Sequence, residues 1–181
     1  MASLLSFLKF SHCEKHDWQS PDNYIHACYT DIAPLYTERG LDKDIWAFAS
    51  GDQSVEYPVL MGVVMYLTAL PLNDIRDYYF LNIFLLALLF IATVFIAQRI
   101  NVYGFYYALA PAVIGSLFIN WDLWGIPTML LAIYWYDRKK FDYSAIALGI
   151  SVATKFFPVL LLIPILAIAG RENRLPIRYL S

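Results

Sequence analysis

The 181-residue sequence is poor in charge, in cysteine and in recognisable targeting signals. Charged residues make up only 15% of the chain and no basic run suits a nucleic-acid partner, which excludes a nucleic-acid-binding role. The apolar residues 1–10 have neither a basic start nor a cleavage site, so they are not a signal peptide. They are too short to cross a bilayer, and we interpret them as the end of a membrane helix whose beginning is missing.

Apolar residues are abundant instead, and they are concentrated in long runs. Hydrophobic side chains make up 60% of the sequence and aromatic side chains 17%, with a mean hydropathy of +0.53. Ordinary soluble domains are only about 45–50% apolar. The pattern predicts an all-α fold, a polytopic bundle of membrane helices.

The polar segment 11–57 separates the apolar start from the apolar runs that begin at Pro58. It carries nine acidic and three basic residues, whereas the remainder of the chain is net basic. We predict that it is a long extracytoplasmic loop that contains short amphipathic helices.

Two kinds of cross-link are considered for this loop, a metal site and a disulfide. The side chains of His12, Cys13, His16 and His26 are usual zinc ligands, but their spacing matches no familiar zinc pattern, so we predict no metal site. Cys13 and Cys28 form a disulfide if the loop faces an oxidising compartment, and they stay free thiols if it does not.

A short helix is predicted to begin at about Asp31 and to end at Gly40. Ile32, Leu35 and Tyr36 have the i, i+3, i+4 spacing of one helix face. Such a helix lies on the membrane surface with Asp31 at its N-cap. Two roles therefore stay open for Asp31, a capping residue and a catalytic carboxylate.

Five apolar segments follow, and residues 78–97 are the most secure membrane span because they are long and uncharged. Residues 58–72 barely cover a hydrocarbon core of about 30 Å at about 1.5 Å per residue. Residues 102–119 form a third candidate with a kink at Pro111. Residues 121–136 are a short fourth candidate with aromatic ends.

Basic residues predict the orientation of the fifth segment, residues 143–169. The Arg-Lys-Lys run at 138–140 and the three arginines of 171–178 indicate that the connectors on both sides are cytoplasmic. The segment is then a hairpin of two short helices that turns near Lys155. The alternative is a single tilted span with Lys155 in mid-membrane.

Asp122 and Lys155 are isolated charges within the apolar part of the sequence. A charge in mid-membrane costs about 2.5–3.5 kcal/mol on insertion scales, so each needs water or a partner. The functional interpretation is a polar cleft in which Lys155 compensates a phosphate and Asp122 orients it or binds sugar hydroxyls. The structural alternatives are a helix cap for Asp122 and, for Lys155, a lysine that reaches the interface. If the loop 11–57 and Asp122 both lie outside, an even number of crossings must separate them, yet three candidate segments do. Either residues 58–72 are re-entrant, or Asp122 faces the cytoplasm.

Four motifs occur in order along the chain: Trp18 with Tyr24-Ile25-His26-Ala27-Cys28-Tyr29-Thr30-Asp31-Ile32, Leu35-Tyr36 and Arg39-Gly40; Glu56-Tyr57-Pro58-Val59-Leu60; Asn120-Trp121-Asp122; and Thr154-Lys155-Phe156-Phe157-Pro158. Together they resemble glycosyltransferase family 87, the GT-C-type membrane glycosyltransferases of actinobacteria that include polyprenyl-phosphate-mannose-dependent mannosyltransferases. The resemblance covers about residues 18–164.

The resemblance implies a plasma-membrane hexosyltransferase, in particular a mannosyltransferase, of cell-envelope biosynthesis. It moves a sugar from a polyprenyl-phosphate donor to a lipid or glycan acceptor with inversion. The family's catalytic loop aspartate corresponds to Asp31, which is expected to act as general base. A cation, Lys155 or Arg39, is expected to stabilise the leaving phosphate. The expected substrate-binding residues are Lys155, Arg39, Asp122, Tyr36 and Glu56. No metal or other cofactor is expected.

Two departures from the family predict a truncated, GT-C-like chain. Family members have a full helix before the loop and several more helices after the basic connector, and this sequence has neither, so we expect a fragment that is inactive alone. We expect a single membrane domain, residues 1–181, with its loop at 11–57, transmembrane and re-entrant helices at 58–170 and a cytoplasmic connector at 171–181.

Two other function classes compete with a transferase. In a transporter or channel fragment, Asp122 and Lys155 line a polar path midway along a pore. A structural membrane subunit has no site. The transferase instead requires Asp31 and Lys155 to open onto one cleft.

Overall fold

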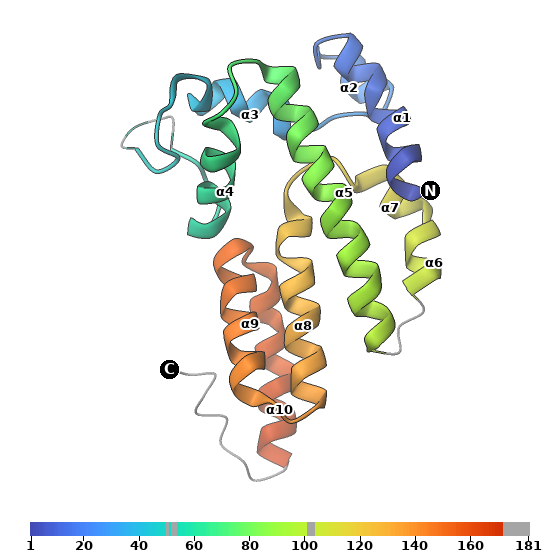
Figure 1. Ribbon diagram of the computed structural model, residues 1–181, viewed down its shortest axis with the longest axis vertical. Coiled ribbons are helices and arrows are strands. Elements are labelled where there is room, and N and C mark those ends of the chain that lie inside the picture. Colours follow the sequence, from blue (N-terminus) through green and yellow to red (C-terminus); the bar gives the residue numbers. More distant parts are fainter. Residues whose placement is uncertain (50, 52–53, 101–103, 172–181) are drawn as a thin grey trace.

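The computed structural model describes residues 1–49, 51, 54–100 and 104–171, and every regular element within these ranges is a helix (Figure 1). The all-α prediction is therefore confirmed. The elements are α1 (Ala2–Lys15), α2 (Asp22–Ile25), α3 (Ile32–Glu38), η1 (Leu41–Lys43), α4 (Val59–Ala69), α5 (Ile75–Arg99), α6 (Gly104–Leu109), α7 (Pro111–Ser116), η2 (Asp122–Trp124), α8 (Ile126–Asp137), α9 (Phe141–Thr154), η3 (Phe157–Leu161) and α10 (Leu162–Arg171). The predicted connector at 171–181 lies almost wholly outside the described residues.

The longest element, α5, runs through the middle of the molecule (Figure 1). Its first turn is capped by Asp74, whose carboxylate accepts hydrogen bonds from the backbone amides of Arg76 at 2.7 Å and Asp77 at 3.4 Å. Its 25 residues give a length of about 37 Å. Within the described ranges, α5 is the one helix that is long and apolar enough to cross a membrane.

The other predicted membrane segments are shorter or broken, so the structure does not support a bundle of several full-length crossings. Residues 58–72 contain only the 11-residue α4, and residues 121–136 contain η2 and all but the last residue of the 12-residue α8. The described part of 102–119 is two six-residue helices, α6 and α7, rather than one kinked helix. The break has a local cause, because Pro111 lacks an amide hydrogen and starts α7 as its first residue.

Residues 143–169 form the predicted hairpin. Lys155 follows α9 with extended backbone angles (φ −147°, ψ 140°), and η3 and α10 then return along α9. Ile165 of α10 belongs to the same core cluster as Ala147 and Leu148 of α9. The hairpin alternative is therefore confirmed, because a single span cannot bring these residues into one cluster.

The N-terminal helix α1 packs against α7. The hydroxyl of Ser6 donates to the carbonyl of Ile114 at 2.9 Å, and the ammonium of Lys9 donates to the carbonyl of Gly115 at 2.8 Å. These contacts attach α1 to residues more than a hundred positions away.

The predicted loop 11–57 begins later than expected. Helix α1 continues to Lys15, because Cys13 projects into the core with an exposed fraction of zero and extends the buried face of the helix. Cys13 is bonded to Cys28, so the disulfide alternative is confirmed. The cross-link ties the segment that carries α2 to the end of α1.

Helix α3 lies across the end of α5, and its start is joined to the segment before η2. The amide of Asp31 donates to the carbonyl of Ile119 at 2.7 Å, and the Thr30 hydroxyl donates to the carbonyl of Phe118 at 2.8 Å. Hydrogen bonds therefore join the segment that contains Asp31 to the segment that leads into Asp122.

Gly40 ends the helical region of α3 as predicted. Its φ of +68° is left-handed, and a Cβ at this position would lie 2.6 Å from Cδ1 of Ile45. The left-handed backbone angle favours glycine here, since other residues rarely adopt it, and a larger residue would also displace the Ile45 side chain.

Candidate functional site

Asp31 stands at the N-cap position of α3 but does not cap the helix. Its backbone is already helical (φ −81°, ψ −21°), and its carboxylate makes no bond to the amides of the first turn. The carboxylate instead accepts hydrogen bonds from two phenols, Tyr29 at 2.5 Å on Oδ1 and Tyr57 at 3.4 Å on Oδ2. The capping role is therefore wrong. The Asp31 carboxylate is hydrogen-bonded to side chains and not to the backbone of the helix.

Lys155 occupies the turn between α9 and η3 and is buried, with a side-chain exposed fraction of 8%. Its ammonium lies 2.7 Å from Oδ1 of Asp122. Space for the side chain is provided by Gly125, since a Cβ there would lie 3.2 Å from Cβ of Lys155. The alternative in which Lys155 reaches out to the membrane interface is therefore wrong, because its side chain is buried and paired with Asp122.

Tyr57 connects these two groups. Its hydroxyl faces the Asp31 carboxylate, and the Lys155 ammonium lies 3.9 Å from the centre of its ring. A cation over a tyrosine face is attracted by the negative charge of the ring face. Asp31, Tyr57, Lys155 and Asp122 thus form one contiguous polar cluster. They come from the loop before α3, the residue before Pro58, the turn before η3 and the first residue of η2.

Both phenols of the cluster keep their protons at neutral pH. The hydrogen bond to Asp31, with some burial, raises the pKa of Tyr29 to about 12. Burial raises the pKa of Tyr57 well above its usual range, and the charges of Asp31 and Asp122 raise it further. The phenols are therefore donors, and Asp31 is the acceptor.

Arg39 and Glu56 flank Asp31 on its other side. The Arg39 guanidinium lies 2.8 Å from Oε1 of Glu56. These two residues, Asp31 and Tyr57 line a cavity of about 310 Å³, whose remaining lining residues are Leu35 and Val55. The structure thus brings together five of the six predicted site residues around Asp31 and Tyr57: Asp31, Lys155, Asp122, Arg39 and Glu56.

Tyr36 does not join them. Its ring is buried and stacks on Tyr78 with centroids 4.5 Å apart, and its hydroxyl donates to the carbonyl of Leu72 at 3.0 Å. The predicted substrate-binding role for Tyr36 is therefore replaced by a structural one, because the helical turn between Asp31 and Tyr36 directs the two side chains to different surroundings.

A second, acidic cavity of about 500 Å³ opens beside Asp31. Its lining residues include Asp17, Asp31 and Glu38 but no lysine or arginine. Tyr24 and Tyr29 also line it, with rings that stack at a centroid distance of 5.4 Å. Two buried polar atoms of lining residues, Nε1 of Trp18 and Oδ1 of Asn23, have no hydrogen-bond partner within the described part of the chain.

A third cavity is apolar and has a volume of about 640 Å³. It lies between the start of α4, helix α9 and the η3–α10 segment, and its lining residues are Tyr57, Pro58, Val59, Ala145, Leu148, Gly149, Val152, Ala153, Phe156, Val159 and Leu162. Tyr57 lines this cavity and also the cavity with Arg39, so it stands where an apolar groove meets the polar cluster.

Tyr29 and Tyr57 were not assigned a role from the sequence. Both occur in the motifs quoted above, and Tyr29 stands two positions before Asp31. That proximity was the available signal for Tyr29. No local signal existed for Tyr57, which is 26 positions from the carboxylate it contacts.

Comparison of the chain with models of protein families, with curated proteins and with solved structures finds no match.

Proposed function

We propose that the chain is a GT-C-like membrane glycosyltransferase, or the part of one that carries the catalytic loop. It moves a hexose, in particular mannose, from a polyprenyl-phosphate donor to a hydroxyl of a lipid or glycan acceptor with inversion. One observation carries the proposal: Tyr57 contacts both the Asp31 carboxylate and the buried Lys155 ammonium, at the end of an apolar groove.

The chemistry needs a base and a cation on opposite sides of the reacting carbon. Asp31 removes the proton of the acceptor hydroxyl while its oxygen bonds to the anomeric carbon. The bond between that carbon and the phosphate oxygen breaks with its electron pair, and Lys155 stabilises the charge that develops on the leaving polyprenyl phosphate. A single displacement of this kind inverts the anomeric configuration. Asp122 holds the Lys155 ammonium in place at 2.7 Å.

The groove suits the lipid part of such a donor. Its lining is almost wholly aliphatic and aromatic, and it leads to Tyr57 at the polar cluster. An isoprenoid chain in the groove would put its phosphate at the groove's polar end, near Lys155. Apolar walls with a few polar groups at one end are typical of sites for amphiphilic ligands.

The acidic cavity suits a neutral glycan acceptor. Asp17 is paired with the Arg76 guanidinium at 2.7 Å, which leaves Asp31 and Glu38 as the carboxylates of the lining without a lysine or arginine beside them in it. These carboxylates disfavour a phosphorylated ligand, whereas sugar hydroxyls bind carboxylates and sugar rings stack on tyrosines.

Membrane location is supported by the exposed surface of α5. Phe84, Leu88, Ile91 and Phe95 are 48–64% exposed and follow one another at helical spacing. Large exposed apolar surfaces mark membrane or protein contacts. The Cys13–Cys28 disulfide supports an oxidising, extracytoplasmic environment for the loop.

A transporter path fits the geometry less well. Asp122 and Lys155 are paired with each other, and Lys155 also contacts the tyrosine that binds Asp31. Charges that serve a translocation path have to face an open pore, and this pair is instead part of the cluster around Asp31.

The experiment measures sugar transfer in membranes that carry the full-length protein, with radiolabelled polyprenyl-phosphate mannose as donor. Asp31→Asn is expected to lower the rate by about 10²–10⁴-fold, the usual contribution of a general base. Asp42→Asn is the matched control, since Asp42 is an exposed aspartate of the same loop, and it should keep the wild-type rate. Equal label incorporation by wild type and Asp31→Asn would remove Asp31 from the mechanism.

A further inference from the structure

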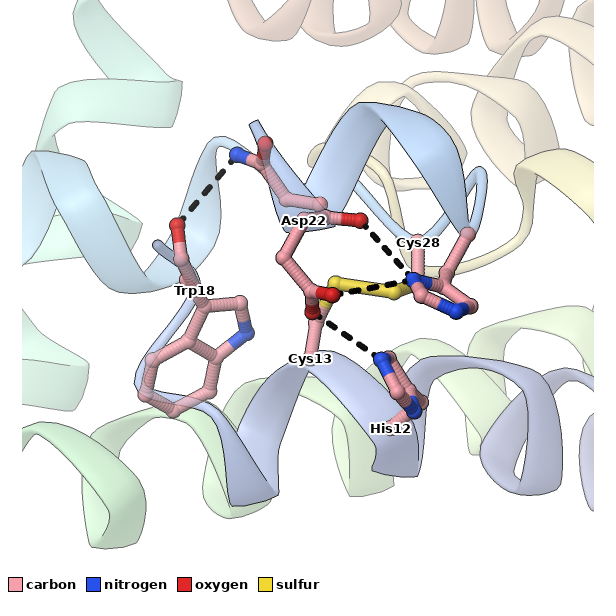
Figure 2. Close-up of polar contacts among 7 residues, drawn as sticks. His12, Cys13, Trp18, Asp22 and Cys28 are labelled. Atoms are coloured by element: carbon pink, nitrogen blue, oxygen red, sulfur yellow. Dashed lines mark hydrogen bonds and ion pairs between the residues drawn. A yellow bond between two sulfur atoms is a disulfide. The ribbon is translucent and has the colours of Figure 1, made fainter. Parts of the chain in front are cut away.

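A second chemical cluster lies at the other end of the loop, where α2 meets α1. His12 on α1 and Asp22 on α2 face each other, with Nε2 of His12 2.9 Å from Oδ2 of Asp22 (Figure 2). Nδ1 of His26, the residue after α2, lies 3.0 Å from Oδ1 of the same carboxylate. One carboxylate thus stands between two imidazoles, and none of these residues belongs to the Asp31 cluster.

His12, Asp22 and His26 lie close enough together to bind one metal ion. One ligand atom from each of His12, Asp22 and His26 lies within 4.8 Å of the other two. Ligands at about 2.0–2.1 Å from a tetrahedral zinc ion are roughly 3.3–3.4 Å apart. The two histidine–carboxylate distances, 2.9 and 3.0 Å, are shorter than this, so each has to lengthen by about 0.3–0.5 Å to admit an ion.

We propose that His12, Asp22 and His26 bind one divalent zinc ion that fastens α2 to α1. Two imidazoles and one carboxylate are a common ligand set for borderline transition metals, whereas calcium and magnesium prefer oxygen ligands alone. The side chains are 34–47% exposed, so the ion can enter and water completes its coordination. No thiolate takes part, because both cysteines are in the disulfide.

The backbone around the cluster is held before any ion binds. Cys13 follows His12 directly, and its disulfide partner Cys28 is two residues after His26 (Figure 2). The rings of His12 and His26 also pack against each other with centroids 3.9 Å apart. A site that is already assembled loses little conformational freedom on binding an ion.

The ion has a structural consequence for the acidic cavity. Helix α2 carries Asn23 and Tyr24, which are lining residues of that cavity. Zinc at Asp22 therefore holds one wall of the cavity in place. This inference does not depend on the sugar-transfer proposal, since it concerns the attachment of α2 to α1.

The test is calorimetric titration of zinc chloride into the full chain in detergent micelles, with any affinity tag removed. Wild type is expected to bind one zinc per chain. His12→Gln, Asp22→Asn and His26→Gln are each expected to bind at least about tenfold more weakly. His16→Gln is the matched control, because the His16 ring stacks on His12 at 4.5 Å but lies outside the three-residue set, and it should bind as wild type does.

Thermal unfolding of the same variants without and with zinc separates binding from folding. Zinc should raise the Tm of wild type and of His16→Gln, and at the same zinc concentration it should raise the Tm of Asp22→Asn by clearly less. The exposed His26 provides a second variant if Asp22→Asn does not fold. Absence of saturable zinc binding by wild type would overturn the site, as would wild-type affinity in His26→Gln or an equal loss in His16→Gln.

Discussion

The ammonium of Lys155 lies 3.9 Å from the centre of the Tyr57 ring, and the hydroxyl of that ring lies 3.4 Å from the Asp31 carboxylate. A buried cation and a partly exposed carboxylate are therefore joined through one side chain. Had Lys155 and Asp31 been at opposite ends of the molecule, the sugar-transfer mechanism would have had no base and cation to combine.

Substitutions at Asp122 and Lys155 should have non-additive effects on the free energy of unfolding. Asp122→Asn leaves a buried ammonium without its carboxylate, and we expect a loss of about 1–3 kcal/mol in the free energy of unfolding. This is less than the cost for a fully buried pair, because Asp122 is 54% exposed. Adding Lys155→Met to Asp122→Asn should recover part of the loss, since the unpaired charge is then gone. Denaturant unfolding of the two single variants and the double variant measures the coupling, and strictly additive effects would contradict it.

The ring and the hydroxyl of Tyr57 should contribute separately to transfer. Tyr57→Phe keeps the ring beneath Lys155 and removes only a long hydrogen bond to Asp31, so we expect a loss of about threefold to tenfold in kcat/KM. Tyr57→Leu also removes the cation–ring contact and should lose more. Transfer assays with the labelled donor compare the two variants. Equal rates for Phe and Leu would show that the ring face has no part in the reaction.

The phenol of Tyr29 should titrate at unusually high pH. Its hydrogen bond to Asp31 raises its pKa from 10 to about 12. Because the protonated phenol is the form that donates, the stabilisation is complete below pH 10 and is lost as the pH rises towards 12. Ultraviolet difference titration of wild type against Tyr29→Phe isolates this group among the 14 tyrosines.

The same titration in an Asp31→Asn background provides the control. Without the carboxylate, the pKa of Tyr29 should move back towards its ordinary value, because the largest cause of the shift is removed. A Tyr29 signal near pH 10 in both backgrounds would disprove the hydrogen bond.

Reduction of the disulfide should loosen the loop. Cys13 and Cys28 are 15 residues apart, and a closed loop of this size contributes about 3 kcal/mol through the entropy of the unfolded chain. We expect a reducing agent to lower the Tm of wild type. The double variant Cys13→Ser, Cys28→Ser should already have the lower Tm and should not respond to the reducing agent, and an unchanged wild-type Tm would contradict the prediction.

Local features of the sequence were sufficient for several parts of the fold. Apolar runs predicted an all-α chain, the spacing of Ile32, Leu35 and Tyr36 predicted α3, and Gly40 marked its end. These features depend on helical periodicity and on backbone angles, which neighbouring residues decide. The same reasoning overestimated the membrane segments, because hydropathy does not register where a helix is interrupted, as it is before Pro111.

The site was predicted only in part for a related reason. Asp31, Lys155 and Asp122 were recognised by charge in unusual surroundings and by motif, but their shared partner Tyr57 was not. The three residues proposed to bind zinc were not grouped from the sequence either, because only the histidines and cysteines were compared for ligand spacing and Asp22 was left out. The Asp22 carboxylate contacts His12 because the chain folds α2 back against α1, and the spacing of residues along the sequence does not show that contact.

The sequence by itself determined that this chain is helical, that nine of its 15 acidic residues lie in the segment 11–57, and that a helix begins just after Asp31. Only the tertiary structure decided that Asp31 does not cap that helix, that Tyr36 is structural, and that Lys155 reaches the same cluster from a distant hairpin. The physical reason is that backbone hydrogen bonds and side-chain periodicity act over a few residues. The pairing of a buried charge depends instead on which remote segments pack together.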